Sequence, residues 1–150
     1  MRNRFTRDVK EVLSYSAEEA IRTKAACIRS RHLLLGMIKQ EHNNAVGLLT
    51  EGFNLSLPVL RKEIEEGLVA EKEESRGGSW RLPLDREAER SIRGSVEEAR
   101  KMGSRDVDTE HLLLAMVRDT GNGLQDIFQR SNVDYPGLVS KMGTRPLSLP

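Results

Sequence analysis

The stretch Ser30-Arg31-His32-Leu33-Leu34-Leu35 has a near copy later in the chain, Thr109-Glu110-His111-Leu112-Leu113-Leu114. The two histidines lie 79 positions apart (32 to 111), and Glu18-Glu19-Ala20 recurs as Glu97-Glu98-Ala99 at the same offset (18 to 97). Further identities at this offset are Arg7 with Arg86, Ser16 with Ser95, Met37 with Met116 and Asn43 with Asn122. Because the match runs without a gap, it indicates an internal duplication, and the chain is predicted to fold as two copies of one unit.

The residues before and within the duplicated stretch predict two helices in each copy. Thr6 and Asp85 are predicted to cap the first helix in the first and second copy. The second helix is predicted to begin at Ser30 and at Thr109, each hydroxyl acting as the N-cap that accepts from an otherwise unpaired amide. Apolar residues three or four apart give the first helix one buried stripe: Phe5, Val9, Val12, Leu13, Ala17, Ala20 and Ile21.

Two further helices are predicted in each copy, which makes the fold all-α. A short third helix is expected over about 44–50, ending near Gly52, and over about 123–130. The fourth is expected to begin after Ser56, with Pro58 in its first turn, and after Asp134, with Pro136 at the matching place and an end at Gly143. Its inward-facing residues are predicted to be Val59, Leu60, Ile64 and Leu68.

No segment shows the sustained alternation of a strand, so we predict two four-helix units related by a pseudo-twofold axis. The whole chain, 1–150, is predicted to be a single domain. Repeat one covers about 4–68, a linker 69–83, repeat two about 84–143, and a flexible tail 144–150. Trp80 in the linker either packs on a groove of the same chain or contacts a partner.

Composition excludes several classes of protein. Lys and Arg number 24 against 23 Asp and Glu, and six aromatic residues make up 4% of the chain, so neither the charge nor the stacking surface favours nucleic-acid binding. The longest apolar run, 33–38, is far shorter than a membrane span, which argues against membrane insertion. The single cysteine, Cys27, favours a reducing compartment, and the chain is predicted to be cytoplasmic.

The sequence offers no catalytic or metal-binding pattern. It lacks a phosphate-binding loop with its lysine, and no cofactor is expected in this segment. His32, His42 and His111 are dispersed, and His32 and His111 are predicted to pack and bond neighbouring backbone, with a metal pair across the pseudo-twofold axis as the alternative. Cys27 is interpreted as a small buried hydrophobic residue, and the Glu and Arg residues of the long helices as solvated surface. An enzyme using Glu110 and His111 is disfavoured, because adjacent residues on a helix point apart.

One arrangement suggests binding. Thr109 and Glu110 open a helix, where free amides and the positive end of the dipole would favour an anion and the carboxylate would favour a guanidinium. A ligand carrying both groups would find a partner for each. The alternative interpretation is a cap followed by a favourable first-turn acid.

The doubled pattern resembles the Clp repeat domain, the amino-terminal domain of Clp/Hsp100 unfoldases, and most of all its ClpC branch. The resemblance covers about 4–143. It implies a module that docks adaptor proteins and protein substrates above a hexameric AAA+ ring, which feeds a ClpP-type peptidase and binds ATP in downstream modules. It also implies a phosphoarginine receptor, in which Glu110 is the acid that matches the family's Thr-Glu-His box, with Thr109 beside it.

The first repeat departs from that box. Ser30-Arg31-His32 replaces Thr-Glu-His, so we expect no phosphoarginine binding there, whereas Arg31 can still attract a bare anion. The connection 23–28 lacks the family's glycine, and 119–122 lacks its glycine–glutamate turn, so the adaptors of relatives need not bind. A free-standing accessory protein that binds a Clp peptidase or unfoldase, without its own ATPase, is the alternative function.

Overall fold

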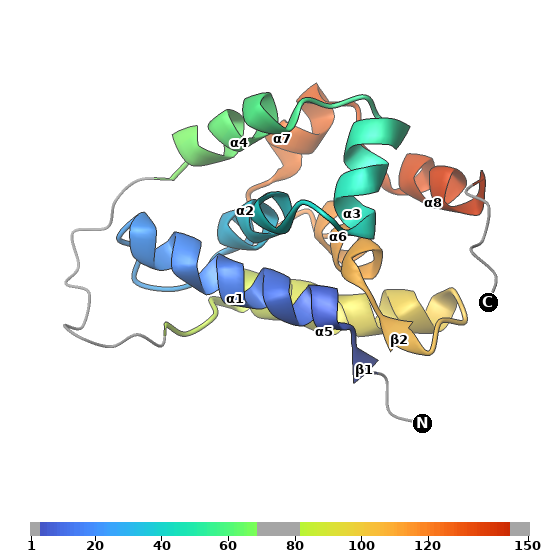
Figure 1. The fold of residues 1–150 in the computed structure, drawn as a ribbon, viewed down its shortest axis with the longest axis horizontal. Helices are drawn as coiled ribbons and strands as arrows, with labels where there is room; N and C mark the ends of the chain where they lie inside the picture. Colours follow the sequence, from blue (N-terminus) through green and yellow to red (C-terminus); the bar gives the residue numbers. More distant parts are fainter. Residues whose placement is uncertain (1–3, 69–81, 145–150) are drawn as a thin grey trace.

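The computed structural model describes residues 4–68 and 82–144. Within these residues, the regular secondary structure is helical apart from two very short strands (Figure 1). Repeat one consists of β1 (Arg4–Phe5), α1 (Arg7–Arg22), α2 (Ser30–Gln40), α3 (Asn44–Gly47), the π-helical turn η1 (Leu48–Gly52) and α4 (Leu57–Glu66). Repeat two consists of α5 (Arg86–Lys101), β2 (Asp106–Val107), α6 (Thr109–Arg118), α7 (Gln125–Arg130) and α8 (Tyr135–Thr144). The predicted all-α tandem fold is confirmed. The described residues do not include Trp80, most of the predicted linker or the tail beyond residue 144.

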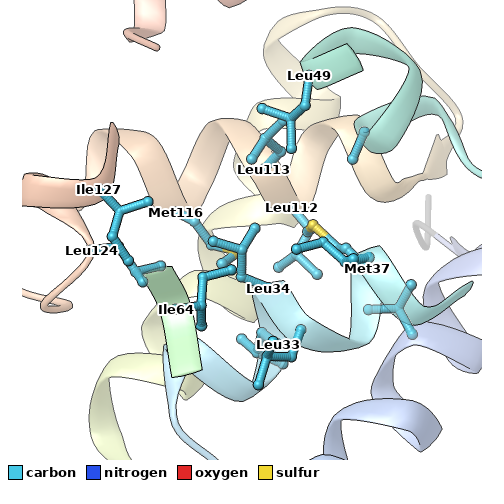
Figure 2. Packing of buried hydrophobic residues seen from close by; sticks show 14 of the residues in the cluster. Leu33, Leu34, Met37, Leu49, Ile64, Leu112, Leu113, Met116, Leu124 and Ile127 are labelled. Atoms are coloured by element: carbon cyan, nitrogen blue, oxygen red, sulfur yellow. The ribbon is translucent and has the colours of Figure 1, made fainter. Parts of the chain in front are cut away.

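The two repeats share one hydrophobic core. In Figure 1 the long helices α1 and α5 lie along one side, α2 and α6 in the middle, and the short helices on the opposite side. The helices α1 and α5 pack on α2 and α6 respectively. Figure 2 shows side chains of α2 and α6 meeting in one cluster, whose labelled members include Leu33, Leu34, Met37, Leu112, Leu113 and Met116. Burying α2 and α6 together removes both leucine-rich segments from water.

Backbone pairing between the repeats confirms the pseudo-twofold relation. The strand β1 pairs with β2 in parallel, with Phe5 opposite Val107. The matching residues 79 positions away, Ile28 and Leu84, form a parallel bridge as well. The segment before the first helix of each repeat therefore pairs with the segment before the second helix of the other. These strands were not predicted, because two residues are too few to show an alternating pattern.

Two residues predicted to face inward are exposed. Ile21 is 49% exposed and Val59 is 59% exposed. On α1 the buried face runs along Val9, Val12, Ser16, Glu19 and Ala20, so Ile21 lies one helical step outside it. On α4 the buried residues are Leu60 and Ile64, one turn apart, which turns Val59 towards water.

A buried glutamate anchors α1 to its neighbours. Glu19 is 1% exposed, so its interpretation as solvated surface was wrong. Its carboxylate lies 2.8 Å from Nη2 of Arg22, 3.5 Å from Nζ of Lys39 and 3.7 Å from Nη2 of Arg61. Burial opposes ionisation most strongly, but the hydrogen bond from Arg22 and the three cations together outweigh it and hold the pKa of Glu19 below its ordinary value.

The second repeat holds the matching glutamate in the same way. Glu98 is also 1% exposed, and its carboxylate accepts from Nη1 of Arg118 at 2.8 Å and lies 3.5 Å from Nζ of Lys101. These cations occupy the positions of Lys39 and Arg22. The hydroxyl of Tyr135 also donates to Glu98, and this bond raises the pKa of the tyrosine. Both repeats therefore bury one carboxylate among cations.

We predict that Glu19 makes stability depend on pH. Because the pKa of Glu19 is lower in the folded than in the unfolded protein, its contribution is present above the unfolded pKa and is lost as the pH falls through the folded pKa. Glu19→Gln should lose about 2 kcal/mol of unfolding free energy at neutral pH. As the pH is lowered from about 6 to about 3, the melting temperature of Glu19→Gln should fall less than that of the wild type, because the variant has no carboxylate at residue 19 to protonate. The matched control is Glu18→Gln, which changes an exposed neighbour and should alter neither the unfolding free energy nor its pH dependence. Equal pH profiles for Glu19→Gln and the wild type would contradict the prediction.

The absence of a side chain at Gly36 lets α2 pack closely on α1. A Cβ added there would lie 2.4 Å from Oγ of Ser16 and 2.6 Å from the carbonyl oxygen of Val12. At the matching position of repeat two stands Ala115, and it is α5 that carries a glycine, Gly94. A Cβ added to Gly94 would lie 3.1 Å from Cβ of Ala115, a tight contact but a longer one.

We predict that Gly36→Ala lowers the free energy of unfolding by about 1–3 kcal/mol, because α1 and α2 must move apart. Gly94→Ala should cost clearly less, since the gain in helix propensity offsets a milder overlap. Urea unfolding of both variants measures the difference. Equal losses would show that the two helix pairs do not differ in this way.

Candidate functional site

The start of α6 is held by Asp108 rather than by Thr109. Oδ1 of Asp108 accepts from the Thr109 amide at 2.7 Å, and the Asp108 amide donates to Nδ1 of His111 at 2.9 Å. In repeat one, Arg29 occupies the same place and its amide donates to Nδ1 of His32 at 2.9 Å. The predicted caps were therefore one residue too late. The prediction that both histidines bond neighbouring backbone is confirmed.

The two predicted cap hydroxyls lie inside the protein. Thr109 is fully buried, and its Oγ1 accepts from the backbone amide of Ala45 in repeat one at 3.1 Å. Ser30, at the matching position, is 1% exposed, and its Oγ has no hydrogen-bond partner among the described residues. Thr109 therefore joins the two repeats.

Glu110, by contrast, is half-buried at the surface, where two carboxylates converge. Nδ2 of Asn44, from the start of α3, donates to Oε1 of Glu110 at 3.1 Å and lies 3.4 Å from Oδ2 of Asp108. Thr6 donates to Oδ1 of Asp108 at 3.0 Å. Asn44 and Asp108 were not singled out from the sequence. Two acids beside one neutral amide create a local negative potential that favours a cation with several N–H groups.

Most of the amides expected to be free at this helix start are already paired. The amide of Thr109 donates to the Asp108 side chain, and those of His111 and Leu112 donate to the Asp108 carbonyl at 3.0 and 3.2 Å. An anion would compete with these bonds. The carboxylates, rather than the backbone amides, are therefore the groups of this surface to which a ligand would bind.

Arg31, which occupies the position of Glu110 in repeat one, contacts two backbone carbonyls. Its Nη1 donates to the carbonyl of Ile64 at 3.1 Å, and its Nη2 donates to that of Gly123 at 3.2 Å. Gly123 occupies the position of Asn44, so both repeats use this point to contact the other. Burial lowers the pKa of the Arg31 guanidinium, and repulsion from Arg130 acts in the same direction.

The cysteine lies closer to the surface than the sequence suggested. Cys27 is half-buried, not buried as predicted, because it lies in the connection between α1 and α2. Within residues 4–68 and 82–144, no group of three or more His, Cys, Asp or Glu side chains is placed to hold a metal ion. Over the same residues, no helix has the length and apolar character needed to cross a bilayer.

We predict different costs for removing the two matching hydroxyls. Thr109→Val leaves the buried amide of Ala45 without an acceptor and should lower the free energy of unfolding by about 1–3 kcal/mol. Ser30→Ala removes a hydroxyl without a partner and should be neutral or slightly stabilising. Thr109→Ser is the control that keeps the acceptor. Urea unfolding distinguishes the variants, and equal losses for Thr109→Val and Ser30→Ala would contradict the assignment.

The family model of the Clp repeat (R) N-terminal domain matches residues 4–131. The ATP-binding subunit ClpC of the ATP-dependent Clp protease from Staphylococcus epidermidis is 33% identical over 131 residues, which are 87% of this chain and 15% of that protein. The chain thus spans only 15% of the length of this curated relative.

Solved structures show the same fold. The N-terminal domain of the chaperone ClpD from Arabidopsis thaliana superposes with a TM-score of 0.70 at 19% identity, covering 93% of this chain and 95% of that one. The N-terminal domain of Hsp104 from Candida albicans gives a TM-score of 0.77 at 14% identity, covering 98% and 94%. With the family model matching most of its length, the chain belongs to the Clp repeat N-terminal domain family.

Proposed function

We propose that the chain is the docking domain of a ClpC-like Clp ATPase. In this role it receives adaptor proteins and protein substrates, which the AAA+ ring unfolds and passes to a ClpP-type peptidase. It acts by binding, and the chemistry belongs to other parts of the assembly. Membership of the Clp repeat family and the 33% identity to a ClpC subunit support this role.

Within that role, Glu110 forms a receptor for phosphorylated arginine. The observation that carries this proposal is the half-buried Glu110 carboxylate, which lies beside that of Asp108 and is bonded to Asn44. A guanidinium phosphorylated on one nitrogen keeps N–H groups that can pair with Glu110, while its phosphoryl group points away from the two acids. The fully buried Thr109 contributes by fixing the start of α6.

Only one such receptor is expected in the chain. Arg31 replaces the acid in repeat one, and a guanidinium repels the guanidinium of a phosphoarginine side chain. A single charge-assisted pair at a half-exposed position gives modest affinity. Strong capture of a tagged protein would then need several phosphoarginines or several copies of this domain.

Titration of a phosphoarginine peptide, followed by calorimetry, tests the receptor. The wild type should bind one equivalent, and Glu110→Gln should weaken binding by about tenfold or more, because a charge-assisted bond is lost. Glu97→Gln, which changes an exposed glutamate on α5, is the matched control and should bind as the wild type does.

Two results would contradict the receptor. The first is equal affinity of wild type and Glu110→Gln for the phosphorylated peptide. The second is equal binding of the unphosphorylated arginine peptide, which would mean that the surface responds to any guanidinium.

A further inference from the structure

A pocket of about 380 Å³ opens at the start of α2, on the seam between the repeats. Its lining includes Arg29 and Arg31 from repeat one, Glu87 from the first turn of α5, and the backbone of Gly67 and Gly123. Nothing in the proposed role of Glu110 uses this pocket. It is the pseudo-twofold counterpart of the Glu110 surface, since Gly123 occupies the position of Asn44.

The charges at the two matching places are opposite. Asp108 and Glu110 stand at the start of α6, and Arg29 and Arg31 stand at the same two positions of α2. At both positions the side chain is positively charged in repeat one and negatively charged in repeat two. The start of α6 therefore presents two carboxylates, whereas the start of α2 presents two guanidinium groups to one pocket.

Arg31 is held in place by its surroundings. Its two bonds to the carbonyls of Ile64 and Gly123 use two of its five N–H donors. The guanidinium also lies flat against Gly67, because a Cβ added there would be only 2.2 Å from Cζ of Arg31. A side chain at residue 67 would displace the guanidinium, so this glycine keeps the cation at the pocket wall.

The positive charge of Arg31 has no carboxylate within 4.0 Å among the described residues. Arg130 repels it and Asp126 attracts it from farther away. Arg29 is half-exposed, and its Nη1 lies 3.6 Å from Oδ2 of Asp85. A partly desolvated guanidinium bonded to neutral carbonyls gains from an anion more than a solvated one does.

We propose that this pocket binds an oxyanion, a carboxylate or a phosphate, with Arg31 as the main contact and Arg29 as the second cation. Glu87 in the lining and Asp85 beside Arg29 offset part of the positive charge of the two arginines, which limits the charge that the pocket accepts. A carboxylate of a docked polypeptide therefore fits better than a doubly charged phosphate. The chain then has two recognition points of opposite sign, one in each repeat.

The test follows the amide signals of Gly67 and Gly123 in the whole labelled chain by NMR during titration. The probes are inorganic phosphate, a short peptide with one glutamate, and the same peptide with glutamine, at constant ionic strength. Both signals should shift saturably with phosphate and with the glutamate peptide. Arg31→Gln should weaken binding by about tenfold or more, the loss expected for a charge-assisted pair.

Further variants keep the test valid if Arg31→Gln is poorly folded. Arg29→Gln and Glu87→Gln change half-exposed side chains, and they should weaken and tighten binding respectively, each by a few-fold. Gly67→Ala should weaken binding by displacing the guanidinium of Arg31. Glu110→Gln is the control from the other repeat and should leave oxyanion binding unchanged, which separates this proposal from the phosphoarginine receptor.

The outcomes decide both the site and the source of its ligand. Binding of the glutamate peptide but not the glutamine peptide would support the pocket and assign it to a carboxylate of a partner protein. Saturation with phosphate alone would support it as a site for the free ion. The proposal is overturned if neither probe gives saturable shifts, or if Arg29→Gln and Glu87→Gln bind both probes as the wild type does.

Discussion

The fold depends on burying two leucine-rich helices against each other. The helices α2 and α6 carry apolar side chains almost all the way round, and Leu33, Leu34, Leu112 and Leu113 are essentially inaccessible to water (Figure 2). A helix that is apolar on every side needs cover on every side, and the long helix of its own repeat provides only part of it. The shorter helices of the same repeat and elements of the other repeat provide the rest. Duplication is therefore the means by which a unit too small for its own core obtains one.

Both proposed recognition points lie on the same seam. Each second helix begins where it meets the other repeat, through Thr109 and Ala45 on one side and Arg31 and Gly123 on the other. In repeat two the buried Thr109 bond fixes the helix start and leaves the neighbouring Glu110 at the surface, whereas in repeat one Arg31 itself makes the contact. The two repeats share the same backbone arrangement and differ in the charged side chains at their helix starts. This arrangement explains how one backbone design presents an acidic surface in one repeat and a basic pocket in the other.

Most of the architecture could be predicted from the sequence because the repeat offset reports it directly. What could not be predicted depends on tertiary packing. The burial of Glu19 is invisible locally, since the Arg61 that faces it comes from α4. For the candidate site, Glu110 was identified, but its partner Asn44 comes from the other repeat. Local backbone also tolerates change: Lys24 adopts a positive φ of 59° where its counterpart Gly103 has 69°, so the lost glycine did not alter the turn.

The exchanged pairing of β1 with β2, and of Ile28 with Leu84, ties the two repeats together from both directions. A ribosome synthesises the chain from one end only, so repeat one leaves the exit tunnel long before its pairing partners exist. Until Val107 and the helix behind it have emerged, β1 has no strand beside it and the leucines of α2 are only partly covered. The order of synthesis thus imposes a delay on the first half of the molecule, during which its most apolar helix is incompletely covered and prone to aggregation.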